Sequence, residues 1–357
     1  MSARFHALRV AEIVAETADA NSIRFEVPPA LREAFAFKAG QHLTLRATID
    51  GEEVRRNYSL CTAPADADWM VTVKRIGGGV FSNWIGDQLK PGDTLEVMVP
   101  HGSFTTEFDA AKHRHLVGIA GGSGITPVLS LIKTLLGEEP GSRFTLFYGN
   151  RDSSSVIFLE ALAGLKDKHL GRFEIYHFLD QEEQDVELFN GMLDRTRIEE
   201  AIEHLVPDAP VVAGWFICGP GPMMDAAEGA LLDRGISKER IHIERFTADR
   251  PPESISRAIE QLQQEAAGVT IAVTLDGRTR RVAFTEGNIL DSARTAGMAA
   301  PFACKAGVCA TCRAKVTSGK VEMAARYGLT DEEVAEGYVL TCQSVPLDDG
   351  VAVDYDA

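Results

Sequence analysis

Three cysteines in one short stretch constrain this chain more than any other feature. Cys304, Cys309 and Cys312 are separated by four and then two residues, and Cys342 follows after a long gap. This spacing is typical of plant-type ligation of a 2Fe–2S cluster, which needs four thiolates. Gly307 lies within the stretch and would let the backbone come close to the cluster. The sequence therefore predicts these four cysteines as metal ligands.

Two other interpretations of the cysteines exist, a zinc site and buried structural thiols. Zinc sites commonly pair two short Cys-x-x-Cys arms, whereas only one such arm is present. The two remaining cysteines, Cys61 and Cys218, lie in different predicted domains. This is not a disulfide framework, so we expect a reducing compartment.

Length and charge bound the remaining possibilities. A chain of 357 residues suggests two or three domains. The formal net charge of −16 argues against binding to nucleic acid or to anionic membranes. The first residues lack the apolar segment of a signal peptide, and no apolar run reaches transmembrane length. We therefore expect a cytoplasmic protein.

Residues 1–108 contain short alternating segments, such as 43–49, 69–74 and 94–99, that predict a small antiparallel β-barrel. On one of its strands, Arg56, Tyr58 and Ser59 provide a cation, an aromatic ring and a hydroxyl. Arginine can hold a phosphate, tyrosine can stack on a flat ring and serine can bond to a ring nitrogen. Alone, this pattern is also that of an ordinary strand face.

A glycine-rich stretch, residues 74–85, favours a flavin site over an ordinary strand face. Glycines followed by serine at the start of a helix can cradle a pyrophosphate, although a flexible hairpin loop has a similar composition. With the preceding motif, the stretch predicts a flavin site, and its second phosphate position favours FAD over FMN. The candidate residues here are Lys74, Gly79, Val80 and Ser82.

Residues 109–246 predict a doubly wound, nucleotide-binding α/β domain. A buried strand over 115–120 is followed by a glycine turn and a helix, which is the arrangement of a dinucleotide phosphate site. A second strand–turn–helix pattern covers 215–224 and places Cys218 at the carboxyl edge of the sheet, although a buried cysteine is equally compatible. The candidate residues are Gly121, Gly122, Gly124, Thr126, Cys218, Gly219 and Pro220.

The second strand of this domain, residues 143–150, ends at Arg151 and a run of serines. A cation at this position favours the 2′-phosphate of NADP, whereas an acid favours NAD. Arg151 and Ser153 therefore predict NADPH as the substrate, with Asp152 as an opposing signal. The serines are also compatible with a helix cap. The acidic run 181–185 is expected to be a solvated loop.

The end of the chain predicts a linker and a third domain. Residues 247–267 contain a short amphipathic helix. Residues 268–357 contain a hairpin, a helix and then the cysteine stretch, as in a compact α+β unit.

In this order, the motifs resemble the ferredoxin–NADP reductase superfamily with a plant-type ferredoxin at the C-terminus. Residues 301–323 and 337–346 are similar to the reductase subunits of phenylacetyl-CoA epoxidases, whose oxygenase is a separate multisubunit di-iron protein. The resemblance implies a β-grasp fold for the last domain. It also implies flavin contacts by Arg56, Tyr58 and Ser59, pyrophosphate contacts by Gly79 and Ser82, and nucleotide contacts by residues 121–126 and 218–220.

The predicted function is electron transfer from NADPH through FAD and a 2Fe–2S cluster to an oxygenase component of a multisubunit complex in phenylacetate catabolism. Tyr58, Ser59 and Cys218 are the candidate catalytic residues. One alternative is a reductase for another aromatic-ring or alkyl oxygenase. An alternative of another class is a redox-sensing or interaction protein, against which the flavin and nucleotide motifs argue.

Overall fold

The computed structural model describes residues 5–246, 253–285 and 287–357. They form two compact units, of which the larger comprises residues 6–54 and 58–244 and the smaller is built mainly from residues after 244. Of the linker predicted over 247–267, residues 247–252 lie outside the described residues. None of the described helices combines the length and apolar character needed to cross a membrane.

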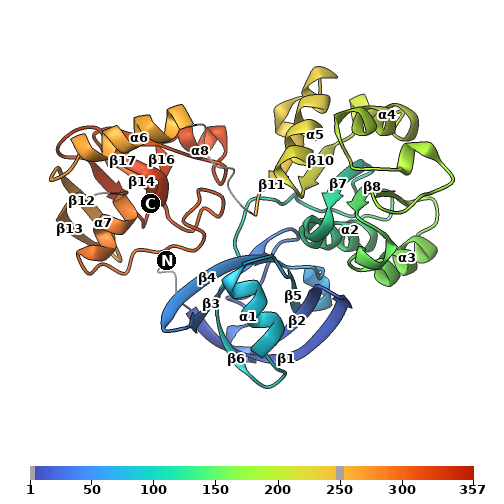
Figure 1. Ribbon diagram of the computed structural model, residues 1–357, viewed down its shortest axis with the longest axis horizontal. Coiled ribbons are helices and arrows are strands. Elements are labelled where there is room, and N and C mark those ends of the chain that lie inside the picture. Colours follow the sequence, from blue (N-terminus) through green and yellow to red (C-terminus); the bar gives the residue numbers. More distant parts are fainter. Residues whose placement is uncertain (1–4, 247–252, 286) are drawn as a thin grey trace. The chain divides into compact units, whose positions relative to one another are not determined.

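A six-stranded sheet forms the first part of the larger unit (Figure 1). The pairs β1–β2, β2–β5 and β3–β6 are antiparallel. Along β1, Leu8 and Val10 are buried and Arg9 is exposed, which is the period-two alternation of a sheet with one core face. A bridge between Leu60, just after β4, and Val71 of β5 joins the two edges and closes the predicted barrel. The elements are β1 (Phe5–Thr17), β2 (Ala20–Glu26), η1 (Pro29–Leu31), β3 (His42–Ile49), β4 (Glu52–Ser59), η2 (Pro64–Asp66), β5 (Trp69–Lys74), α1 (Val80–Gln88) and β6 (Thr94–Met98).

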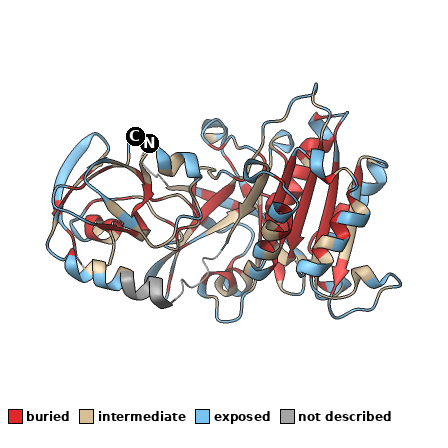
Figure 2. Ribbon diagram, turned by 90° about the horizontal axis from the view of Figure 1, so that it is seen from above, coloured by how far each residue is buried: buried red, intermediate tan, exposed pale blue. Residues whose placement is uncertain are grey.

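A parallel five-stranded sheet of order β11-β10-β7-β8-β9 forms the second part. Helices α2 and α3 cover one face and α4 and α5 the other, so the strands are buried on both sides (Figure 2). The strand order reverses between β7 and β10, where doubly wound sheets bind ligands. The elements are β7 (His115–Gly121), η3 (Gly122–Gly124), α2 (Ile125–Glu138), β8 (Arg143–Asn150), η4 (Ser153–Ser155), α3 (Leu159–Lys168), β9 (Phe173–Leu179), η5 (Glu187–Phe189), α4 (Arg195–Leu205), η6 (Ala209–Val211), β10 (Gly214–Cys218), α5 (Gly221–Asp233), η7 (Lys238–Arg240) and β11 (Ile241–Glu244).

The two parts of the larger unit share a core. Ala39, Cys61 and Phe104 pack in the same apolar cluster as helix α2. Within this contact, Ser130 Oγ of α2 donates to the carbonyl of Thr62 at 2.6 Å. Shared apolar burial of this kind stabilises one arrangement of the barrel and the parallel sheet.

The smaller unit contains a five-stranded sheet of order β13-β12-β18-β14-β16 and a separate pair, β15 and β17. Ile259 and Leu262 of α6 pack against its apolar cluster, so the described part of the predicted linker helix covers this unit. Helix α7 contributes Ile289, Leu290 and Ala293 to the same cluster. The elements are α6 (Glu253–Glu265), β12 (Thr270–Leu275), β13 (Arg278–Ala283), α7 (Ile289–Thr295), β14 (Arg313–Ser318), β15 (Val321–Met323), α8 (Asp331–Ala335), β16 (Tyr338–Leu340), η8 (Thr341–Gln343), β17 (Ser344–Pro346) and β18 (Ala352–Asp354).

Candidate cofactor sites

The four predicted cluster cysteines form two pairs. The thiols of Cys304 and Cys309 are hydrogen-bonded to each other, and so are those of Cys312 and Cys342. The bond from Cys304 holds the pKa of Cys309 well below its ordinary value. In the described part of the chain, no three His, Cys, Asp or Glu side chains converge as a single metal ion would require. Two thiol pairs suit the two irons of a 2Fe–2S cluster better than one tetrahedral zinc ion.

The backbone of the cysteine loop is tightly curled. Lys305, Gly307 and Ala310 all have positive φ angles, of 53°, 74° and 52°. A Cβ atom on Gly307 would lie 3.0 Å from Gln343 Cγ and 3.1 Å from Ala325 Cβ. The glycine is therefore needed for its conformation and for its protein neighbours, in addition to the close approach expected from the sequence. The amide of Ala306 donates to Cys304 Sγ at 3.3 Å, so the loop presents at least one N–H group to a ligand sulfur.

The predicted flavin residues lie on β4. Ser59 is 2% exposed, and its Oγ atom has no hydrogen-bond partner among the described residues. A buried hydroxyl without a partner is costly, and a polar atom of a bound flavin ring would satisfy it. The Tyr58 ring packs 6.0 Å from that of Phe81, while Arg56 on the same strand is exposed. These residues fit a flavin.

The glycine-rich stretch forms a tight turn at the start of α1. The hydroxyl of Ser82 accepts a hydrogen bond from the Ile76 amide at 3.2 Å, and a Cβ atom on Gly79 would lie 2.6 Å from that oxygen. Ser82 and Gly79 therefore shape the turn itself. Because a hydroxyl can accept and donate at once, this bond leaves Ser82 able to donate to a phosphate. Val80 is the first residue of the helix and is 52% exposed.

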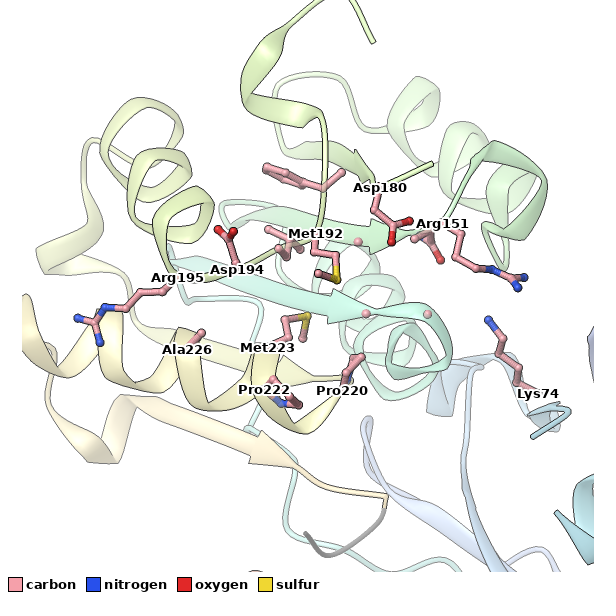
Figure 3. Close-up of a pocket in the computed structure, with 16 residues that line it drawn as sticks. Lys74, Arg151, Asp180, Met192, Asp194, Arg195, Pro220, Pro222, Met223 and Ala226 are labelled. Atoms are coloured by element: carbon pink, nitrogen blue, oxygen red, sulfur yellow. The ribbon is translucent and has the colours of Figure 1, made fainter. Parts of the chain in front are cut away.

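A cavity of about 500 Å³ lies at the carboxyl edge of the parallel sheet (Figure 3). Five predicted residues line it, namely Lys74, Gly121, Gly122, Arg151 and Pro220. The remaining predicted nucleotide residues do not, namely Gly124, Thr126, Ser153, Cys218 and Gly219. The position at the reversal of strand order is the one that the fold predicts for a dinucleotide.

Several of the predicted glycines allow two turns to pack together. A Cβ atom on Gly124 would lie 2.0 Å from the Cys218 carbonyl oxygen, and one on Gly219 would lie 2.9 Å from the Gly121 amide. Only glycine permits this approach of the turn after β7 to the turn after β10. Gly122 differs, because it has a φ of +51° and its nearest described neighbour would be Lys74 Nζ at 3.7 Å.

Cys218 and Thr126 both lie inside the structure. Cys218 is fully buried, and burial raises the pKa of its thiol well above the ordinary value. It is the last residue of β10, beside Glu244 of β11 in the parallel register. Thr126 is 2% exposed and donates to the carbonyl of Ser123 at 3.0 Å. Both side chains support the turns from within.

The end of β8 is organised by Asp152. Its Oδ1 accepts bonds from the Ser155 amide at 2.9 Å and the Ser154 hydroxyl at 2.6 Å. The Ser155 hydroxyl in turn donates to the Asp152 carbonyl. A helix cap is therefore present, but its N-cap residue is Asp152 and not a serine. The serines form the short helix η4 that Asp152 caps.

Sequence reasoning did not select the far wall of the cavity. That wall includes Phe178 and Asp180 at the end of β9, Met192 and Asp194 from the loop that follows, and Met223 of α5. Met192 is 70% exposed. The only signal in the sequence was position, since these residues follow the third strand of the domain.

Comparison with known protein families identifies three parts of the chain. Residues 7–106 match an oxidoreductase FAD-binding domain, residues 119–229 an oxidoreductase NAD-binding domain and residues 273–347 a 2Fe–2S iron–sulfur cluster binding domain. The chain is 44% identical to one of the subunits of 1,2-phenylacetyl-CoA epoxidase from Escherichia coli, over 99% of this chain and 98% of the relative. The chain belongs to the same family of flavin and iron–sulfur reductases. It is accordingly an NAD(P)H-dependent oxidoreductase with FAD, NAD(P) and 2Fe–2S domains.

Other members of the family serve different oxygenases. The ferredoxin reductase component of 3-ketosteroid-9-alpha-monooxygenase from Rhodococcus rhodochrous is 36% identical over 98% of this chain and 96% of its own length. Among solved structures, phthalate dioxygenase reductase has a TM-score of 0.58 and 24% identity, and covers 98% of each chain. This reductase-and-ferredoxin architecture confirms the predicted fold class.

Proposed function

We propose that this chain oxidises NADPH and delivers electrons to a di-iron oxygenase that epoxidises phenylacetyl-CoA. The observation that carries the proposal is the 44% identity, over nearly the whole of both chains, with the Escherichia coli epoxidase component. We further propose a flavin domain over 1–108, a nucleotide domain over 109–246 and a ferredoxin domain over 268–357, joined by the linker 247–267.

Bound FAD would supply acceptance of a hydride from the nicotinamide and release of single electrons, and the 2Fe–2S cluster would supply a one-electron relay. In this chain, we assign Tyr58 and the buried Ser59 hydroxyl to the flavin ring. We assign Cys218, at the carboxyl end of β10, to the nicotinamide end of the site. Because Cys218 is fully buried and does not line the cavity, it would act by supporting the turn after β10, and burial would keep its thiol uncharged by raising its pKa.

The phosphate and metal contacts complete the assignment. The glycine turn after β7 and the start of α1 offer backbone N–H groups to phosphates. The proposed flavin-phosphate residues are Arg56, Gly79, Val80 and Ser82. The proposed nucleotide residues are Gly121, Gly122, Gly124, Thr126, Arg151, Ser153, Gly219 and Pro220. We add Lys74, which the sequence assigned to the flavin stretch, because it lines the nucleotide cavity. The proposed cluster ligands are Cys304, Cys309, Cys312 and Cys342.

Reconstitution tests the proposal. The purified protein is mixed with NADPH, oxygen, phenylacetyl-CoA and the oxygenase subunits of a phenylacetyl-CoA epoxidase, and the epoxide is measured by mass spectrometry. A parallel reaction contains a ketosteroid and its oxygenase, because the ketosteroid reductases are also similar to this chain. We expect product in the first reaction alone. Product in the second alone would reassign the acceptor.

A cluster variant separates the internal steps. In Cys309→Ser, NADPH should still bleach the flavin, whereas reduction of cytochrome c or of the oxygenase should fall strongly because a ligand is lost. If the variant binds FAD normally and flavin bleaching is lost as well, the assignment of separate flavin and cluster domains is wrong.

A further inference from the structure

The guanidinium of Arg151 contacts an acidic residue from the barrel. Arg151 NH2 lies 3.3 Å from Asp19 Oδ2, although the two residues are 132 positions apart in the sequence. The same Oδ2 atom lies 3.7 Å from Lys74 Nζ. The other carboxylate oxygen of Asp19 accepts the Thr17 hydroxyl at 2.8 Å, so the carboxylate is held from both sides.

Arg151 and Lys74 both line the nucleotide cavity, and Figure 3 shows their charged ends turned toward one another at one end of it. Asp19 therefore bridges two cations at the rim of the cavity. A ligand phosphate would bridge the same two cations in the same way, since carboxylate and phosphate oxygens use the same donors. The barrel thus places an internal anion where an external one would bind.

A second carboxylate contacts the same segment. Glu182, in the acidic run that follows β9, accepts a hydrogen bond from the Ser153 amide at 2.7 Å. Ser153 is the other residue assigned to the 2′-phosphate. Both residues assigned to that phosphate are therefore in contact with carboxylates of the chain itself, Arg151 through its guanidinium and Ser153 through its backbone amide.

We infer that Asp19 and Glu182 are determinants of nucleotide choice, acting as internal counter-anions that a 2′-phosphate must displace from Arg151 and Ser153. The inference rests on the proposed role of Arg151. NADH carries no phosphate at this position and therefore does not compete with either carboxylate. The two acids thus lower the preference for NADPH below the level that Arg151 would otherwise confer.

The size of the effect follows from exposure. The side chains of Arg151 and Asp19 are 54% and 30% exposed, and ion pairs of this kind are weak and sensitive to salt. Removing both negative charges should strengthen binding of a 2′-phosphate by about threefold to twentyfold at low ionic strength. The gain should shrink in concentrated salt.

The test uses two nucleotides that differ only in the 2′-phosphate, adenosine 2′,5′-bisphosphate and adenosine 5′-monophosphate. Their dissociation constants are measured calorimetrically on the FAD- and cluster-loaded protein, so that catalysis is not the readout. In Asp19→Asn/Glu182→Gln, we expect tighter binding of the bisphosphate and unchanged binding of the monophosphate. The control Glu33→Gln/Glu183→Gln removes the same charge from exposed positions in the same two regions and should leave the ratio unchanged.

Equal binding gains for the two nucleotides, no gain, or the same gain in the control would overturn the inference. The single variants Asp19→Asn and Glu182→Gln keep the test decisive if the double variant is unstable. Arg151→Ala separates the inference from its premise. If Arg151→Ala leaves bisphosphate binding unchanged, the assignment of Arg151 fails. If Arg151→Ala weakens it but the acid variants have no effect, only the counter-anion role fails.

Discussion

The hydroxyl oxygens of Thr341 and Tyr355 lie 2.7 Å apart, next to two of the candidate cluster ligands. Thr341 precedes Cys342 and donates its own proton to the carbonyl of Cys312 at 2.9 Å. Tyr355 must therefore be the donor to Thr341. The Tyr355 amide in turn donates to the Thr274 carbonyl on β12 at 3.0 Å. The end of the chain thus connects the ligand pair Cys312 and Cys342 to the central sheet.

Removing the Tyr355 hydroxyl should loosen this ligand pair. The net contribution of one hydrogen bond to stability is about 0.5–1.5 kcal/mol. In Tyr355→Phe we therefore expect the cluster to be lost to a chelator roughly twofold to tenfold faster than in the wild type. The measurement is the decay of visible absorbance, together with the linewidth of the reduced cluster in electron paramagnetic resonance. Tyr338→Phe is the control, because its ring stacks under Arg313 on β14. Equal decay in wild type and Tyr355→Phe would contradict the coupling.

A pair of histidines, of which His42 is buried and His101 is half-buried, should make the larger unit sensitive to acid. His42 and His101 approach to 3.0 Å through their Nε2 atoms, and Glu244 lies 3.6 Å from His42 Nδ1. Burial, with His42 as a second cause, lowers the pKa of His101 to about 3. In the unfolded chain, His101 binds a proton near pH 6.5. The contribution of neutral His101 to the free energy of unfolding is therefore complete above that pH and is lost as the pH falls toward 3.

Between pH 6.5 and 5, this histidine should therefore reduce the free energy of unfolding by about 2 kcal/mol. In His101→Gln, the decrease in the free energy of unfolding between pH 6.5 and 5 should be smaller by about 2 kcal/mol. Urea unfolding followed by tryptophan fluorescence at both pH values checks this. An identical pH dependence in the variant would show that other groups determine the acid sensitivity.

The ion pair between Arg114 and Glu139 should be important for stability. The Glu139 side chain is fully buried and accepts two bonds from Arg114, at 3.0 and 2.8 Å, and one from Ser142 at 2.7 Å. Burial alone would raise the pKa of Glu139, but these bonds outweigh it and lower the pKa. Arg114→Ala leaves a buried carboxylate without its cation, which costs about 3–5 kcal/mol. Chemical denaturation measures this loss.

An exposed pair provides the matched control. Arg9 and Glu26 are 59% and 61% exposed at their side chains, so Arg9→Ala should cost less than about 1 kcal/mol. The contribution of the Arg114–Glu139 pair to the free energy of unfolding should also decrease at low pH. A carboxyl with a lowered pKa loses its contribution to stability when it is protonated. Similar losses in the two variants would refute the role given to burial.

The features that could be predicted from the sequence are those that depend on residues close together in the chain. The spacing of the four cysteines and the strand–turn–helix after residue 115 both depend on neighbouring residues. The steric need for glycine at position 124 could not be predicted from the sequence, because it arises from a contact with Cys218 on another turn. The contact of Asp19 with Arg151 could not be predicted from the sequence either, because it depends on how the barrel packs against the parallel sheet.

Nucleotide preference provides the last prediction. A 2′-phosphate beside Arg151 would gain a charge-assisted bond, which contributes about 1.5–3 kcal/mol when it is sheltered from water. Arg151 is 54% exposed and already paired with Asp19, so we expect Arg151→Ala to lower kcat/KM for NADPH by about fivefold to thirtyfold. The value for NADH should hardly change. Arg143→Ala is the control, because Arg143 begins the same strand that Arg151 follows and pairs with Asp208 at 2.6 Å. Steady-state kinetics with both nucleotides decides the matter, and an equal loss for NADPH and NADH in Arg151→Ala would remove Arg151 from the recognition of the phosphate.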